Sequence, residues 1–190
     1  MSEECPRGDL EFGTIPGMVR RCAETYGDAL AIVDGDVSIS FRDFSSRVDQ
    51  AAKAYMAAGI AKGDRVAIWA PNCWEWVVAL LGLQSAGAVL VPLNTRYKAL
   101  EAVDILRRSR ARMLFTVEGF LGNDYVSMLD AAGRPESLER IVVVRDTGSR
   151  PNGASFLDEL LAEGAIIDDD ELDERVAAVG GSDVSDMLFT

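Results

Sequence analysis

The sequence predicts an α/β fold with a mostly parallel sheet of βαβ units flanked by helices. Short runs rich in β-branched residues alternate along the chain with helix-like segments, which is the order that βαβ units require. The runs at residues 65–69, 89–93 and 112–116 are mainly apolar, as expected for strands that are covered on both faces. With 190 residues, 48% of them apolar, the chain is long enough for one substantial core.

The chain is expected to begin with a helix and a hairpin. A short amphipathic helix is predicted from about Ile15, because Pro16 suits the first turn of a helix and Gly27 suits its end. Strands at residues 29–33 and 37–41 follow, and the Asp-Gly pair between them favours a tight reversal. This part of the chain therefore predicts a small unit beside the main sheet.

The next segments supply the helices and strands of the βαβ units. Residues 42–58 carry apolar side chains at spacings of three and four, which indicates a long helix. Asn72 is expected to cap the following helix, with Glu75 closing a capping box. Further helices are predicted at residues 74–86, 100–110 and 125–131, and a fourth parallel strand at residues 141–144.

Composition and charge exclude several classes of function. The chain holds no histidine, so Ser-His-Asp catalysis, HExxH metal sites and an imidazole base are excluded within it. Cys5, Cys22 and Cys73 form no CxxC pair, which indicates reduced thiols rather than a metal site. The net charge of −12 disfavours nucleic-acid binding. Neither a transmembrane run nor a signal peptide is recognisable, so a cytoplasmic location is expected.

The last part of the chain differs in composition from the rest. We expect an α/β core at about residues 14–145 and a variable acidic segment at about 146–183, with a short helix at 156–161. Residues 161–190 alone carry a net charge of −8, which indicates a solvated helix start and surface. Residues 186–190 are predicted to begin a strand. Because a domain seldom ends on the first residues of a strand, the chain is expected to be an N-terminal fragment. Its apolar end is expected to favour self-association.

Loops at the carboxyl ends of the strands are the first places to search for a site, because ligands of open parallel sheets bind there. Trp74 and Trp76 follow the first strand and either line an apolar channel or pack against neighbouring elements. Asn94 and Arg96 follow the second strand, where an amide and a guanidinium suit a phosphate or carboxylate, or simply form a turn. Two glycines follow the third strand and permit a close backbone approach or a bend: Gly119 and Gly122.

Three strings of sequence resemble the adenylate-forming superfamily, and within it the acyl-CoA synthetases. They are GDRVAIWAPN at residues 63–72, SAGAVLVPLN at residues 85–94 and ISFRDF at residues 39–44. Each string is weakly specific alone, but their order and spacing together are specific. The resemblance runs from about Thr14 to Thr190, and it implies the N-terminal subdomain of the large domain of those enzymes.

The resemblance implies a two-step reaction for the intact protein. An acid and ATP give an acyl-adenylate and pyrophosphate, and the thiol of CoA then displaces AMP, so ATP, Mg²⁺ and CoA are the implied cofactors. Thr190 would be the first residue of the loop that holds the ATP phosphates and Mg²⁺. Most groups that stabilise the transition state would follow that residue, so the fragment alone is predicted to be inactive.

The same resemblance assigns roles to the loop residues. Trp74 and Trp76 favour a fatty or steroid-derived acid as substrate, and four residues would lie near the CoA nucleotide: Asn94, Arg96, Gly119 and Gly122. Two alternatives remain open. One is an acyl-AMP ligase or a peptide-synthetase adenylation domain, which would pass the acyl group to a carrier protein. The other is a stand-alone α/β binding module without enzymatic activity.

Overall fold

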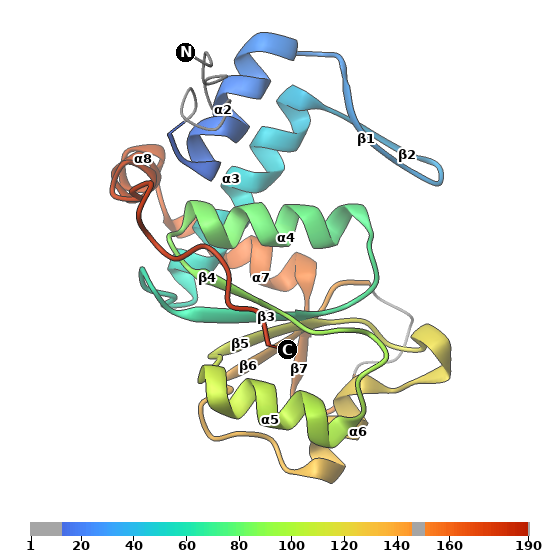
Figure 1. Ribbon diagram of the computed structural model, residues 1–190. Helices are drawn as coiled ribbons and strands as arrows, with labels where there is room; N and C mark the ends of the chain where they lie inside the picture. Colours follow the sequence, from blue (N-terminus) through green and yellow to red (C-terminus); the bar gives the residue numbers. More distant parts are fainter. Residues whose placement is uncertain (1–12, 146–150, 190) are drawn as a thin grey trace, which may run out of the picture.

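The computed structural model describes residues 13–145 and 151–189, and it shows two sheets (Figure 1). The larger sheet is parallel and five-stranded, in the order β4-β3-β5-β6-β7, so the α/β prediction is confirmed. The smaller sheet is an antiparallel hairpin. The strands are β1 (Leu30–Asp34), β2 (Val37–Ser40), β3 (Arg65–Trp69), β4 (Val89–Pro92), β5 (Met113–Thr116), β6 (Arg140–Val143) and β7 (Ala154–Phe156).

Helices cover both faces of the parallel sheet. Those on one face pack around α3, and α5 packs with α6 on the other face (Figure 1). Apart from two short 3-10 turns, η1 (Phe120–Gly122) and η2 (Gly164–Ile166), the described helices are α2 (Ile15–Tyr26), α3 (Phe41–Ala57), α4 (Trp74–Ser85), α5 (Ala99–Ser109), α6 (Tyr125–Ala132), α7 (Leu157–Glu163) and α8 (Asp169–Ala177). Within the described ranges, no helix combines the length and the apolar character that crossing a bilayer requires.

The predicted cap of α4 is wrong, and the structure shows why. The helix begins at Trp74 with Cys73 in the cap position, so Asn72 lies one residue too early to cap it. The N–H of Trp74 instead donates to Asp34 Oδ2 of the hairpin turn, at 3.1 Å. Glu75 does not fold back to form a capping box, because its carboxylate accepts from Arg145 Nε at 2.7 Å and from Nη2 at 2.8 Å. The carboxylate of Asp34, which is distant in the sequence, therefore accepts a hydrogen bond that a local capping side chain was expected to accept.

Two glycines let the helices on one face approach α3 very closely. A Cβ atom on Gly82 of α4 would lie 2.5 Å from the Cβ of Ala51 and 3.2 Å from the backbone nitrogen of Ala52. A Cβ atom on Gly164 of η2 would lie 2.8 Å from the backbone nitrogen of Ala54. Because protein atoms do not pack at such distances, the spacing of α3 from α4 and from η2 depends on these two glycines.

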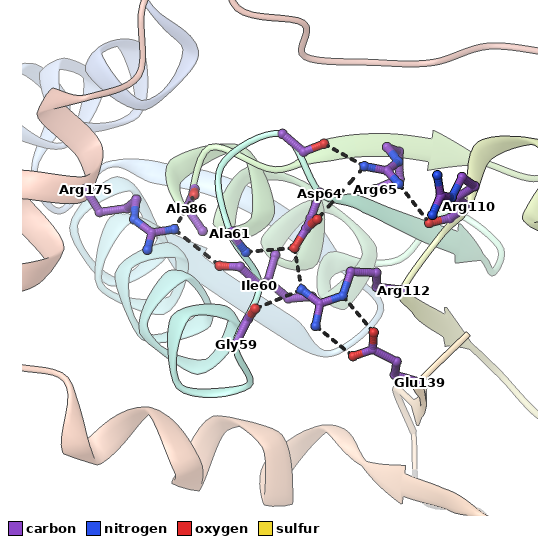
Figure 2. Close-up of polar contacts among 11 residues, drawn as sticks. Gly59, Ile60, Ala61, Asp64, Arg65, Ala86, Arg110, Arg112, Glu139 and Arg175 are labelled. Carbon is purple, nitrogen blue, oxygen red and sulfur yellow. Dashed lines mark hydrogen bonds and ion pairs between the residues drawn. The ribbon is translucent and has the colours of Figure 1, made fainter. Parts of the chain in front are cut away.

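A polar cluster closes the amino-terminal edge of the sheet (Figure 2). Arg112, just before β5, donates to the carbonyl of Gly59 after α3 at 2.9 Å and also pairs with Asp64 and Glu139. Arg65, at the start of β3, donates to the carbonyl of Ser109 at the end of α5, at 2.7 Å. Guanidinium groups are favourable at these positions because the carboxyl ends of helices carry partial negative charge.

The acidic helix α8 is attached to the body of the domain by the same kind of contact. Arg175 donates to the carbonyls of Ile60 and Ala86, both at 3.2 Å, and Figure 2 shows its guanidinium pointing at these two carbonyls. Lys53 of α3 pairs with Asp169 at 2.7 Å. The acidic segment therefore includes a docked helix as well as solvated carboxylates.

The segment after α8 runs along the free edge of β4. Leu90 donates its N–H to the carbonyl of Ser185 at 2.9 Å and accepts from the N–H of Met187 at 2.8 Å. The strand expected at residues 186–190 is represented here by one parallel bridge, between Leu90 and Asp186. Strand β7 was not predicted, because three residues are too short to show an alternating pattern.

Candidate functional site

An open groove lies at the carboxyl ends of β3 and β4, where the sequence indicates a site. Its volume is about 500 Å³. The residues that line it come from the loop after β3, from α4 and from the loop after β4. They are Ala70, Pro71, Asn72, Trp76, Pro92, Leu93, Asn94, Thr95 and Tyr97, and together they are called the β3–β4 groove. Of the predicted site residues, the groove brings together Trp76 and Asn94.

Two buried aromatic side chains hold the rim of the β3–β4 groove in place. Trp69 Nε1 donates to the carbonyl of Asn94 at 2.9 Å, and the hydroxyl of Tyr125 donates to the carbonyl of Thr95 at 3.0 Å. The two rings pack edge to face with centroids 4.4 Å apart. Burial raises the pKa of Tyr125, so its hydroxyl keeps the proton that it donates. The rim is therefore ordered by the core before any ligand arrives.

The groove suits an uncharged ligand group better than a phosphate. Its polar side chains are amides and hydroxyls: Asn72, Asn94, Thr95 and Tyr97. Arg96 is exposed beside the groove, and its N–H donates to Asn94 Oδ1 at 2.9 Å, which forms a local turn. No lining residue carries a charge at neutral pH, so the lining offers contacts to a ligand but no charged acid or base. A phosphate of ATP or CoA would have to reach Arg96 outside the groove.

The two tryptophans of α4 have different environments. Both pack against the core, but only Trp76 lines the groove, whereas Trp74 lies under the guanidinium of Arg47, 4.9 Å from the ring centroid. Trp74 also borders a small space of about 40 Å³ between α3, α4 and α7. The packing interpretation therefore applies to both side chains, and the channel interpretation suits only Trp76.

The loop after β5 contains the two glycines predicted at a CoA rim. Gly119 has φ 77° and Gly122 has φ 75°, both in the region that glycine adopts without strain. Leu121 between them has φ 55°, which is costly for a residue with a side chain. These glycines are explained by the turn itself, and neither lines the β3–β4 groove.

The thiol next to the groove is not equipped for catalysis. Burial raises the pKa of Cys73 to about 11, and the Glu75 carboxylate adds to the shift, so the thiol remains protonated at neutral pH. Within residues 13–145 and 151–189, no set of three or more His, Cys, Asp or Glu side chains is grouped to hold a metal ion. Thr190, predicted to contact ATP phosphate and Mg²⁺, lies outside the described residues.

A second hollow of about 570 Å³ lies elsewhere, beside the start of α2 and the amino end of β4. It is lined in part by Gln84, Gly87 and Asp183. Although this hollow is larger, it is not at the carboxyl edge of the sheet, where βαβ folds place their ligands. The β3–β4 groove is therefore the better candidate.

Sequence reasoning missed three residues of the site. Tyr97 lines the groove, Asn72 lines it instead of capping α4, and Tyr125 fixes its rim from α6. Asn72 had a usable signal, since it directly follows a buried strand. Tyr125 had none, because its contact with Thr95 joins residues that are distant in the sequence.

Comparisons with a family model and with curated proteins agree on the family of this chain. The family model described as "AMP-binding enzyme" matches residues 19–190. Two curated relatives are CoA ligases named for a propanoyl group that carries a methyl-dioxo-octahydroindenyl ring system. The one from Rhodococcus jostii is 40% identical over 93% of this chain, and the one from Mycobacterium tuberculosis is 42% identical over 95%. The chain spans 35% and 34% of the lengths of these relatives.

Solved structures with the same fold include CoA ligases and an isolated N-terminal domain. The anthranilate CoA ligase AuaEII matches with a TM-score of 0.70 at 24% identity, covering 80% of this chain and 28% of that chain. The N-terminal domain of FACL13 from Mycobacterium tuberculosis matches with a TM-score of 0.62 at 25% identity, covering 90% of this chain and 37% of that chain. With the family match over residues 19–190 and the sheet topology described above, the chain belongs to the AMP-binding enzyme family.

Proposed function

We propose that this chain contributes the N-terminal part of an AMP-forming ligase that joins a carboxylic acid to CoA. The observation that carries the proposal is the 40% identity to a ring-bearing propanoyl:CoA ligase across 93% of the chain. The reaction would proceed through an acyl-adenylate, with ATP and CoA as co-substrates and Mg²⁺ on the phosphates. Because the chain spans 35% of that relative, the chain alone is expected to lack activity.

We further propose that the acid is apolar, either fatty or derived from a steroid, with a fused-ring propanoic acid as the first candidate. Both curated ligases are named for such an acyl group. The groove offers Trp76 and Tyr97 together with neutral amides, which suits an apolar body with carbonyl substituents better than a charged one. The role of this groove is to bind and orient, and the reacting groups would come from Thr190 onward.

The test is a chimera in which residues 1–190 replace the matching third of the Rhodococcus jostii ligase. The chimera is expected to release pyrophosphate when given the fused-ring propanoic acid, and AMP once CoA is added. EDTA is expected to abolish both products. A folded chimera that is inactive on ring-bearing and fatty acids alike would refute the proposal.

Two controls complete the experiment. The 190-residue chain alone should release no pyrophosphate, and activity of that chain would refute the expectation that it is inactive by itself. Pyrophosphate release without CoA-dependent AMP release would favour transfer to a carrier protein instead.

A further inference from the structure

The loop after β5 places two carboxyl groups directly opposite each other. Glu118 and Asp124 are partners in an antiparallel bridge, and the N–H of Gly119 donates to the carbonyl of Asn123 at 2.9 Å within it. Side chains opposite each other in such a bridge lie about 4.5–5.5 Å apart at their Cβ atoms, and like charges there repel. The two carboxyl groups are hydrogen-bonded to each other, which requires that one of them carries a proton.

The surroundings place that proton on Glu118. Asp124 accepts the hydrogen bond from Glu118, and it also accepts from the N–H of Ser127 at 2.9 Å and from its hydroxyl at 2.6 Å. These donors lower the pKa of Asp124. Burial, and then the neighbouring Asp124, raise the pKa of Glu118 to about 8, although the N–H of Val126 opposes the shift. The titratable groups that face Glu118 are Asp124, which caps α6, and Tyr125 at the start of that helix, and η1 carries none.

The carboxyl pair is connected to the β3–β4 groove through the first turn of α6. Asp124 caps this helix, and the next residue is Tyr125, whose hydroxyl holds the carbonyl of Thr95 on the groove rim. The loop closed by the pair contains Leu121 at positive φ, so it needs contacts at its ends to keep that conformation. The carboxyl pair, the loop and the rim are therefore joined through consecutive residues of the chain.

We propose that Glu118 and Asp124 form a proton-dependent latch. With the proton in place, the latch closes the loop at residues 119–123 and, through Tyr125, braces the groove rim at Asn94 and Thr95. Loss of the proton puts a second negative charge beside Asp124, which opens the loop and loosens the rim. This inference is independent of the reaction proposed above, because it concerns only contacts within this chain.

The test is amide hydrogen exchange of the 190-residue chain between pH 6 and pH 9.5, read by mass spectrometry and corrected for the intrinsic exchange rate at each pH. Peptides covering residues 117–127 and 93–98 are expected to lose roughly tenfold protection above about pH 8, as expected for one coupled proton. The peptide at the start of α8 is the matched control. Asp168 caps that helix in the same way, accepting from the N–H of Glu171 at 2.8 Å.

Two variants separate a latch from a merely structural contact. Glu118→Gln keeps a donor towards Asp124 that does not titrate, so the loss of protection at high pH should disappear. Tyr125→Phe should leave the pH response at residues 117–127 and remove it at residues 93–98, because only the link to Thr95 is cut. A flat profile in the unsubstituted chain, or the same alkaline loss in Glu118→Gln, would overturn the proposal.

Discussion

Replacing Gly82 by alanine tests whether the spacing of α3 and α4 limits the stability of the domain. The new methyl group would lie 2.5 Å from the Cβ of Ala51, and the closest ordinary contact is 3.4 Å, so the helices must separate by about 1 Å. The backbone of Ala52 is also close, at 3.2 Å, so rotation of a side chain cannot relieve the clash. We therefore expect a cost of about 3 kcal/mol, at the upper end of overpacking.

Part of that cost is offset, because alanine is a better helix former than glycine by about 1 kcal/mol. The net loss in the free energy of unfolding should be about 2 kcal/mol. For a domain of this size it should lower the Tm by roughly 4–8 °C. Urea denaturation followed by circular dichroism measures the loss directly, and an unchanged m value would show that the unfolded state is not affected.

The matched control is Ala51→Gly, which removes the other methyl group of the clash. Alone it should cost about 2 kcal/mol through helix propensity and lost burial. Combined with Gly82→Ala it should cost less than the sum of the single changes, by about 2 kcal/mol, because the new methyl group then fills the vacated space. Strict additivity of the two changes, or a fully stable Gly82→Ala variant, would refute the packing argument.

Three other outcomes are expected. Arg112→Met should lower the free energy of unfolding by about 2 kcal/mol in urea denaturation at pH 7, because it removes the side-chain donor to the carbonyl of Gly59 and one of the donors to the carboxylate of Asp64; an unchanged midpoint would contradict this. Burial raises the pKa of Asp64, but the N–H of Ala61 and Arg112 outweigh that effect and lower it. The stability that this carboxylate contributes is therefore present above its unfolded pKa and lost as the pH falls towards its folded pKa, and acid titration of Arg112→Met should show a smaller loss. In the chimera, Trp76→Ala should raise KM for the acid more than Trp74→Ala does, because only Trp76 lines the groove although both rings pack against the core; equal effects on KM would refute the different roles given to the two side chains.

Local sequence patterns were sufficient for every strand except β7, but not for the contacts that surround the strands. Strand β3 was predicted with its observed bounds, because a buried parallel strand reads as an apolar run. The cap of α4 could not be predicted, since Asp34 reaches it from a hairpin turn far away in the sequence. Gly82 carried no signal either, because a glycine inside a helix looks unfavourable until the neighbouring helix is placed against it.

The candidate site was recovered only in part, for a related reason. The rule that ligands bind beyond the carboxyl ends of parallel strands located Trp76 and Asn94 in the β3–β4 groove. The same rule also selected Gly119 and Gly122, whose conformations are explained by their own turn. Position along the chain identifies residues at the carboxyl edge of the sheet, but only the packed fold separates residues that line one groove from residues that merely share that edge.

The two edges of the sheet have opposite chemical characters, and this has a consequence for how such a protein diversifies. At one edge, the side chains of Arg65, Arg112 and Arg175 bind helix ends, so a substitution there disturbs several elements at once. At the other edge, Asn72, Trp76 and Tyr97 face open space. Substitutions at the groove are therefore expected to cost less folding stability than substitutions at the arginine edge, so the two edges of the same sheet differ in how much sequence change they tolerate.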